Sequence, residues 1–441
     1  MTANYRRTHG SGFLLAPLSI AALSIAIATL GACSDGGGEI PPPGELAASE
    51  LSRELAPEVS AEQARTLVAG NTGFALDAYR VLGEADGNVF YSPLSISTAL
   101  AMTYAGARGA TESQMAGALH YDLSQAELHP AFNSLDLQLA SRGQGSAGEG
   151  FRLTIANATF GQKGYEFLPD YLDVLAVNYG AGMSLLDFAS DAAGSRKAIN
   201  DWVGKVTEDR IPELLAEGVI NPSTRLVLTN AVYFKAAWKT PFEENATTGG
   251  TFHGLDGDVT VDMMSGTPAS MGHAAGEGFR AVSLPYQGDE LDMVLIMPDE
   301  GNFSAFEAGL DAATLAGIFA DLDDGQNAGG SGALVMPKFE FRFKSDLVAM
   351  FQSLGMTDAF DGAADFSGID GTRNLAISAI VHEAFVNVNE AGTEAAAATA
   401  VGFDESAAPQ SLTIDRPFVF LIRDVETGAI VFLGRVTDPT K

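Results

Sequence analysis

The chain has 441 residues, of which 46% are hydrophobic, so it can bury a large core and has the composition of a folded globular protein. Its 25 Lys and Arg residues stand against 56 Asp and Glu residues, which gives a formal net charge of −31. A field of that sign repels phosphate backbones and anionic lipid headgroups, so nucleic acid is excluded as an expected partner.

The first 32 residues have the order of an export signal. A pair of arginines precedes an apolar, small-residue run over 13–30, and the run leads into the string Leu-Gly-Ala-Cys that ends at Cys33. About 18 apolar residues are also marginally long enough to span a bilayer, so an uncleaved membrane anchor is the competing interpretation. Cys33 is the only cysteine in the chain, and the string resembles the lipobox of bacterial lipoproteins.

That resemblance implies that residues 1–32 are removed and that Cys33 is lipidated. The mature protein would then be exported and either held at the bacterial cell envelope, with Ser34 permitting sorting to the outer membrane, or released outside the cell. Residues 33–63 are rich in Gly, Pro and Glu and lack a sustained apolar period, which predicts a flexible tether. The folded body is expected to cover residues 64–441.

Helix signals dominate the first part of the body. Apolar spacing predicts an amphipathic helix over 66–82. Ser92-Pro93 predicts the start of a buried helix, with the serine as N-cap and the proline in the first turn. Further helices are expected from Thr111 and over 125–142.

Strand signals dominate later. The mostly apolar run 225–234, rich in β-branched and aromatic residues, predicts a central strand that is covered on both faces. Turn residues between 281–286 and 291–297, and again between 417–422 and 429–436, predict two hairpins. Helices early, strands late and hairpins throughout favour an α+β fold.

Catalytic and cofactor motifs are missing. The chain has no G-x-S-x-G nucleophile elbow, and its six histidines form no closely spaced ligand pair. Gly143, Gly145 and Gly148 match the spelling of a dinucleotide fingerprint, but they follow a polar helix end instead of a strand, so a flexible loop is expected there. No cofactor and no metal are expected.

Several long strings, in the same order, resemble the motifs of the serpin family. They are Asn88-Val-Phe-Tyr-Ser-Pro-Leu-Ser95, Leu226-Val-Leu-Thr-Asn230-Ala-Val-Tyr-Phe-Lys-Ala-Ala-Trp238, Met336-Pro-Lys-Phe339, His382-Glu-Ala-Phe-Val-Asn-Val-Asn-Glu390 and Arg416-Pro-Phe-Val-Phe420. The resemblance spans residues 64–441. It implies the serpin fold, with three β-sheets, about nine helices and an exposed reactive-centre loop over about 390–411. It also implies an irreversible suicide-substrate inhibitor of serine proteases, with cysteine proteases as a further target class, and not an enzyme.

The resemblance also assigns positions to individual residues. Ser95, Asn230 and His382 fall at the shutter beneath the main sheet, and Trp238 falls at the breach where the loop enters. From the residues alone, His382 would be a satisfied core histidine and Trp238 a core aromatic residue.

The segment from Glu390 to Val401 consists almost entirely of small residues. A short alanine helix or a disordered linker is one interpretation. The other is a loop that can become a strand inside an existing sheet, because small side chains on the inward-facing positions enter a formed core without overpacking. The hinge residues of this interpretation are Glu390, Gly392, Thr393, Ala395, Ala396, Ala397, Ala398 and Thr399.

The reactive bond follows from counting within the resemblance. In inhibitory serpins the residue before the bond lies fourteen after the hinge glycine and eleven before the proline of the Arg-Pro-Phe-Val-Phe strand, and both counts give Ser406 here. The bond is therefore Ser406–Ala407, and a slip of one residue would move it to Glu405–Ser406. A small residue in that position suits elastase-like or subtilisin-like proteases.

Two other functions stay open at this stage: a non-inhibitory serpin that acts as a binding or structural envelope protein, and a hydrolase on an unrelated fold. The helix expected over 125–142 is poor in Lys and Arg, so no heparin-type cofactor is expected. A monomer is expected.

Overall fold

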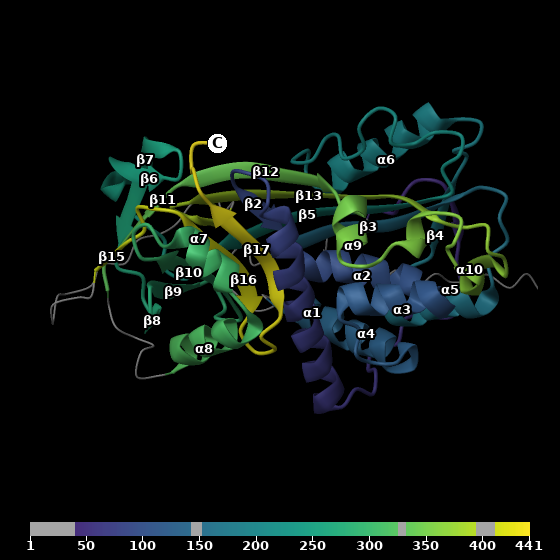
Figure 1. The fold of residues 1–441 in the computed structure, drawn as a ribbon, viewed down its shortest axis with the longest axis horizontal. Coiled ribbons are helices and arrows are strands. Elements are labelled where there is room, and N and C mark those ends of the chain that lie inside the picture. The colour runs from purple at the N-terminus through teal and green to yellow at the C-terminus, as the bar shows by residue number, and fades with distance from the viewer. Residues whose placement is uncertain (1–39, 143–151, 325–331, 394–410) are drawn as a thin grey trace, which may run out of the picture. The chain divides into compact units, whose positions relative to one another are not determined.

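The computed structural model describes residues 40–142, 152–324, 332–393 and 411–441. In these residues the chain forms three β-sheets, ten α-helices and two short 3-10 helices (Figure 1). The α+β fold with three sheets that the sequence predicts is confirmed.

The largest sheet, sheet A, has seven strands in the order β1-β4-β3-β5-β14-β13-β12. They are β1 (Glu45–Ala47), β3 (Arg152–Gln162), β4 (Met183–Leu186), β5 (Leu226–Ala237), β12 (Phe339–Asp346), β13 (Ile377–Asn389) and β14 (Gly392–Thr393). Strands β5 and β13 pair in parallel, and the two residues of β14 lie between them at one end.

The other two sheets are smaller. Sheet B contains β2 (Val89–Tyr91), β8 (Gly272–Gly276), β9 (Phe279–Pro285), β10 (Leu291–Pro298), β16 (Phe418–Asp424) and β17 (Ile430–Val436). Sheet C contains β6 (Thr248–Gly254), β7 (Gly257–Gly266), β11 (Leu334–Pro337) and β15 (Leu412–Thr413). Both hairpins predicted from the sequence are present, as β9 with β10 and β16 with β17.

The helices are α1 (Ala61–Leu82), α2 (Pro93–Tyr104), α3 (Gly109–Leu119), α4 (Gln125–Ser141), α5 (Pro169–Tyr179), α6 (Ala192–Val206), α7 (Phe303–Gly309), α8 (Ala312–Asp323), α9 (Val348–Ser353), α10 (Ser367–Asp370), η1 (Glu244–Ala246) and η2 (Asp358–Phe360). Five of the helices, α1, α2, α4, α6 and α8, begin directly after a serine or aspartate, residues that favour helix starts. Ser92 caps α2 by accepting a hydrogen bond from the Ser95 amide, and Pro93 occupies the first turn, as predicted.

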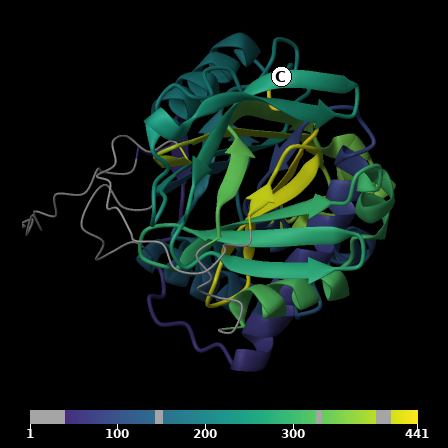
Figure 2. The ribbon, with the colours of Figure 1, turned by 90° about the vertical axis from the view of Figure 1, so that its left-hand side faces the viewer.

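Strand β5 is buried along nearly its whole length because both of its faces are covered. Side chains alternate between the faces of a strand. Leu228 and Val232 therefore pack on the side of α2 and sheet B, whereas Val227 and Ala231 pack in a cluster with α6. Figure 1 shows α6 on one side of sheet A and α1 to α5 on the other. Figure 2 shows α8 packed against sheet B, where it contacts β8 and β9.

The start of the folded body differs from the prediction. Residues 40–63 were expected within a flexible tether, but β1 pairs antiparallel with β4, and α1 already begins at Ala61. The compact unit begins at Ile40 instead of residue 64. The physical reason is that backbone hydrogen bonds and a few polar contacts hold this segment. Such contacts do not require apolar side chains at regular spacing, so the sequence shows no periodic pattern there.

Within the described part of the chain, no single helix has the length and apolar character needed to cross a membrane; only α7 and α8 taken together do, and they are bent by 104° where they meet. The predicted signal run and Cys33 lie outside the described residues.

Candidate functional site

The seam between β5 and β13 is the candidate site. The two strands pair directly from Leu226 and Ile377 up to Tyr233 and Phe385. Beyond that point β14 lies between them: Thr393 pairs with Ala236 on β5 and with Val388 on β13. The seam is therefore closed at one end and already holds a piece of a third strand at the other.

Gly392 is required at the open end. Its φ is +152°, and a Cβ atom added there would lie 2.1 Å from the carbonyl oxygen of Ala236. The hinge before it is tied to the chain that leaves β5, because the Trp238 amide donates to the carbonyl of Ala391 (3.0 Å) and the Phe242 amide donates to that of Glu390 (2.9 Å). Glycine is thus needed for close approach of two backbones and not only for flexibility.

Thr393 has no exposed surface, and its hydroxyl lies 2.8 Å from that of Tyr286. Burial raises the pKa of Tyr286 above its usual value, so this hydroxyl stays neutral and can donate or accept. The ring of Tyr286 stacks on that of Trp238, with centroids 4.7 Å apart. Trp238 in turn donates its indole N–H to the carbonyl of Asn389 (2.9 Å). The threonine hydroxyl thus forms its hydrogen bond with a tyrosine that is held in place by stacking on Trp238, and these two rings are called the aromatic wall here.

Glu390 marks the end of β13 and is held from two sides. Its Oε1 accepts hydrogen bonds from Thr247 Oγ1 (2.7 Å) and Lys338 Nζ (3.1 Å), and Lys338 Nζ lies 2.9 Å from Oε2. Partial burial acts to raise the pKa of Glu390, but the hydrogen bonds from Thr247 and Lys338 hold it below its usual value. The carboxylate is therefore ionised at neutral pH.

At the closed end, Ser95 of α2, Asn230 of β5 and His382 of β13 lie together. Asn230 faces His382 across the seam, and its Oδ1 accepts a hydrogen bond from His382 Nδ1. Its Nδ2 donates to Ser95 Oγ (2.7 Å) and to Asn157 Oδ1 (2.6 Å), while Asn157 Nδ2 donates to the carbonyl of Ser95 (3.1 Å). These four residues, called the shutter cluster here, join three strands of sheet A to α2.

His382 is neutral in this cluster. It has no exposed surface, and burial lowers its pKa to about 3. Because Asn230 Oδ1 can only accept, the proton of the ring sits on Nδ1. The other ring nitrogen, Nε2, is buried and has no hydrogen-bond partner among the described residues. The closed end of the seam is therefore held by a polar network with one unused acceptor.

Some predicted residues lie outside the description. They are Cys33, the hinge residues Ala395, Ala396, Ala397, Ala398 and Thr399, and the predicted reactive bond Ser406–Ala407. The described chain ends at Thr393 on one side of this loop and resumes before β15 on the other.

The structure adds four residues that the sequence analysis does not single out: Asn157, Thr247, Tyr286 and Lys338. Lys338 stands inside the quoted Met336-Pro-Lys-Phe339 string, which was a signal that could have been used. The other three reach the seam from strands and loops far along the chain, so no local pattern identifies them.

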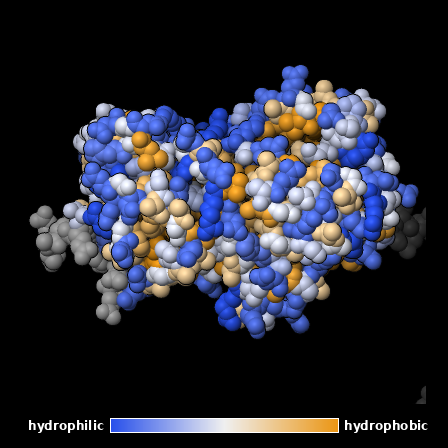
Figure 3. Space-filling view, viewed as in Figure 1, coloured by the Kyte–Doolittle hydropathy of each residue, from blue (hydrophilic) through white to orange (hydrophobic). Residues whose placement is uncertain are grey.

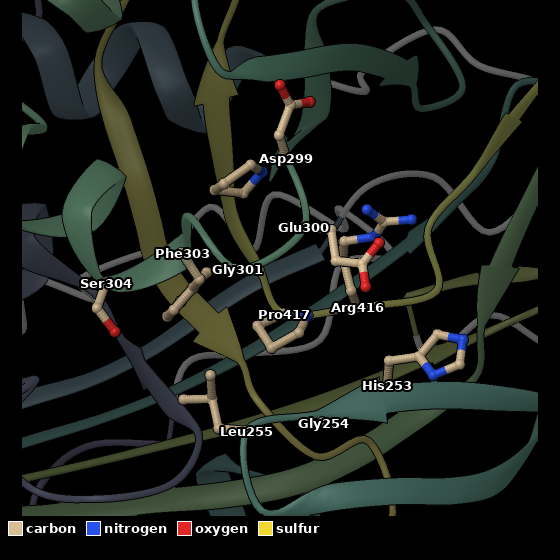
Figure 4. Close-up of a pocket in the computed structure, with 11 residues that line it drawn as sticks. His253, Gly254, Leu255, Asp299, Glu300, Gly301, Phe303, Ser304, Arg416 and Pro417 are labelled. Atoms are coloured by element: carbon tan, nitrogen blue, oxygen red, sulfur yellow. The ribbon is translucent and has the colours of Figure 1, made fainter.

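A separate hollow of about 300 Å³ lies between the β6–β7 turn, the loop that leads into α7, and the chain before β16 (Figure 4). Arg416 lines it and is paired with Asp415. None of its lining residues belongs to sheet A. In the described ranges no group of three or more His, Cys, Asp or Glu side chains could hold a metal ion.

Comparisons with known proteins agree on one family. The family model described as "Serpin (serine protease inhibitor)" matches residues 69–439. The chain is 40% identical over 383 residues to "Leukocyte elastase inhibitor" of Sus scrofa, covering 85% of this chain and 99% of that protein. Among solved structures, uncleaved ovalbumin matches with a TM-score of 0.76 at 26% identity, covering 85% of this chain and all of that one. Human glycosylated kallistatin matches with 0.75 at 30%, covering 86% and 99%.

Proposed function

Because the chain belongs to the serpin family of serine protease inhibitors, we propose that it traps its target by inserting its cleaved reactive-centre loop into sheet A. Similar proteins from Sus scrofa and Homo sapiens are named leukocyte elastase inhibitors. The observation that carries the proposal is β14: the first two residues of the inserting segment already pair with both strands of the seam.

The chemical step uses the groups of the protease. Its nucleophilic serine oxygen attacks the carbonyl carbon of Ser406, the bond from that carbon to the nitrogen of Ala407 breaks, and the amine leaves with the proton that the protease histidine supplies. An ester then joins Ser406 to the protease. Insertion of the freed segment before water hydrolyses this ester drags the protease and distorts its oxyanion hole.

The register of β14 predicts the path of insertion. Gly392 and Thr393 pair with Ala237 and Ala236 in an antiparallel sense, so each further residue of the loop would pair one position further down β5. Carried on, this register places Thr399 between Asn230 and His382, the two shutter residues that now pair with each other. The residues from 394 to Ser406 would move the cut end by about 40 Å at ~3.3 Å each.

Small side chains make this path passable. Thr393 faces the core, so Ala395, Ala397 and Thr399 would face it as well, and none of them overfills the space that opens. Thr399 brings a hydroxyl to the place where the Asn230–His382 bond has to break. The new ladder hydrogen bonds, at about 0.5 to 1.5 kcal/mol each, sum to enough free energy to deform an attached protein.

The proposed targets are elastase-like or subtilisin-like serine proteases, with cysteine proteases as a further class. Two observations support this choice: Ser406 is small enough for a shallow specificity pocket, and several relatives are named leukocyte elastase inhibitors. The proposed location is the bacterial cell envelope, through a lipid on Cys33.

The test is to mix the purified chain from Cys33 onward with pancreatic elastase or subtilisin and to run a denaturing gel. A covalent adduct that survives SDS is expected, and trypsin, whose pocket requires Arg or Lys, serves as the comparison. Cleavage of the loop without an adduct would contradict inhibition and would favour the non-inhibitory alternative.

A further inference from the structure

Residues 40–55, called the strap here, are built into the body by specific contacts. β1 pairs with β4 at the outer edge of sheet A, and Trp202 of α6 donates its indole N–H to the carbonyl of Ile40 (2.8 Å). At the other end of the strap, Arg53 Nε donates to Asn133 Oδ1 (2.8 Å), and Asn133 Nδ2 donates to the carbonyl of Glu54 (2.7 Å). The Glu54 amide also donates to the carbonyl of Val177 on α5 (2.9 Å), so the strap contacts β4, α4, α5 and α6.

Two details show that the strap belongs where it lies. Asn133 on α4 has no exposed surface, and its Oδ1 accepts a hydrogen bond from Arg53, so loss of the strap would leave this oxygen without that donor, while Nδ2 would keep only its longer bond to the carbonyl of Val177 (3.4 Å). Gly44 has φ +112°, and a Cβ atom there would lie 2.5 Å from the carbonyl oxygen of Leu185 on β4. The strap also precedes residue 69, where the family match begins. It is an addition to the common body.

The strap carries most of the exposed apolar side chains. On the face drawn in Figure 3, hydrophobic residues are scattered among hydrophilic ones. Of the seven large hydrophobic residues that the described chain leaves exposed, four lie in the strap, at exposed fractions from 44% to 74%: Ile40, Leu46, Leu51 and Leu55. These four side chains fall within sixteen residues, more than in any other segment of the described chain.

The strap lies at the end of sheet A that is remote from the hinge. In the strand registers, Glu45 of β1 pairs with Leu185 of β4, Leu185 with Gly161 of β3, and Gly161 with Leu226, the first residue of β5. Gly392 of the hinge pairs with Ala237, the last residue of β5. The two ends of β5 are about 36 Å apart at ~3.3 Å per residue.

The docked strap also shortens the tether. With the body starting at Ile40, seven residue steps separate it from Cys33, and they reach at most about 25 Å. If the folded body started at residue 64, the tether from Cys33 would be several times longer.

We propose that the strap is a membrane-contact surface: in the lipidated protein it lies against the bilayer and turns the hinge at Gly392 and Thr393 away from the membrane. This rests on the lipid anchor of the proposed function. The short tether brings the strap to the bilayer, and its leucines enter the headgroup region, which adds a second, weaker contact to the lipid chain. Because acidic residues greatly outnumber basic ones in the chain, 56 against 25, the surface that suits it is zwitterionic and not anionic.

The two tryptophans of the chain report on this orientation. Trp202 lies beside the strap, and Trp238 lies at the hinge end of β5. The chain from Cys33 onward is coupled through its only thiol to a maleimide phospholipid in phosphatidylcholine vesicles that contain a dansyl lipid, and energy transfer from tryptophan to dansyl is measured. In Trp238→Phe, where Trp202 is the sole donor, we expect higher transfer efficiency than in the wild type, which averages both donors. Equal or lower efficiency would overturn the proposal.

The leucines are tested in the same assay. Replacing Leu46, Leu51 and Leu55 together by Gln in the Trp238→Phe chain should lower the transfer from Trp202, whereas Leu255→Gln, at a similarly exposed leucine in the β6–β7 turn, should leave it unchanged. Unchanged transfer in the triple variant overturns the proposal, as does a leucine-dependent dimer in sedimentation without vesicles, which would mean that a second copy covers the strap. The lipid is supplied chemically, so mass spectrometry of natural Cys33 and the elastase adduct judge the proposed function separately.

Discussion

The two ends of the β5–β13 seam are built from the same two strands but are held in opposite ways. At the hinge end, backbone pairing with Gly392 and Thr393 and an aromatic wall keep the strands joined through a third strand. At the shutter end, the strands pair directly and are joined by side-chain hydrogen bonds around Asn230.

For the proposed insertion, this difference indicates where the loop would enter the sheet and what would resist it. The hinge end needs only to be extended, because a strand template is already present on both sides. The shutter end has to be opened, because the Asn230–His382 bond occupies the position that the register gives to Thr399. We therefore expect changes at the hinge end to alter trapping, and changes at the shutter end to alter the stability of the intact form.

The largest effect is expected for Thr393→Arg. The side chain is fully buried, and an arginine there would have to desolvate a charge next to Tyr286 and Trp238 or expel β14 from the sheet. Because each 1.4 kcal/mol of added barrier slows a step about ten-fold, we expect the yield of SDS-stable adduct to fall by about ten-fold or more while the loop is still cleaved.

Thr413→Arg is the matched control for that variant. Thr413 lies in β15, just after the loop, and is exposed, so the same substitution should leave trapping intact. Equal trapping by Thr393→Arg and the wild type would break the comparison, because the hinge end would then not be the place where insertion begins.

The next effect is expected for Asn230→Ala. The substitution leaves the buried Nδ1 of His382 without its acceptor and removes one hydrogen bond each from Ser95 and Asn157, which still bond to each other; together this should cost about 2 to 4 kcal/mol. The measurement is the urea midpoint of the intact form. Asn245→Ala, at an exposed asparagine of η1, should change the free energy of unfolding by less than about 0.5 kcal/mol. A shutter variant as stable as this control would show that the closed end is not held by the network.

The pH dependence of stability is a second test of whether the shutter cluster stabilises the closed end of the seam. Burial lowers the pKa of His382 to about 3, and that of His129 on α4 to about 4, against about 6.5 in an unfolded chain. As the pH falls below 6.5, the histidines of the unfolded state take up protons before those of the folded state. The stability that comes from keeping the two buried histidines neutral is therefore complete above pH 6.5. It is lost progressively toward pH 4, by about 1 kcal/mol per pH unit for each histidine.

His382→Gln should therefore have a flatter profile of stability between pH 6 and 4.5 than the wild type, whatever its stability at neutral pH. His253→Gln is the control, because that histidine is exposed and its hydrogen bond with Asp258 raises its pKa. A wild-type slope in His382→Gln would mean that the shutter histidine is not the group that titrates.

The smallest effect is expected for Lys338→Met, which removes the ion pair with Glu390. The lysine is partly exposed, so the loss should be below about 1 kcal/mol and the adduct yield should fall only about two-fold. Lys197→Met, which removes an exposed pair within α6, should change nothing measurable. A larger loss of stability or of adduct yield in Lys338→Met would show that the Lys338–Glu390 ion pair, and not only the backbone pairing of β14, holds the hinge in place.

The elements that can best be predicted from the sequence are those that are specified by a pattern of side chains. The buried helix after Ser92, the covered strand β5 and both hairpins follow from periodicity, capping and turn residues. The residues that resemble a family motif lie around the seam for the same reason: Ser95, Asn230, His382 and Trp238 stand in long strings that could be recognised.

Elements held by their backbone could not be predicted in this way. The strap and β14 are each fixed by a few ladder hydrogen bonds and a glycine that lets two backbones approach, and neither leaves an apolar period. Tyr286 and Asn157 were missed because their role comes from tertiary proximity and not from their neighbours in the chain.

If insertion of the loop releases free energy that the intact fold holds, cleavage of the loop must raise the stability of the chain, and thermal unfolding measures this change. The loop can be cut by a zinc metalloprotease, which uses metal-activated water and forms no acyl-enzyme, so the cleaved chain is free to insert. The melting temperature of the cleaved chain should then lie well above that of the intact chain, because the seam gains a full strand. Identical melting temperatures would contradict the account.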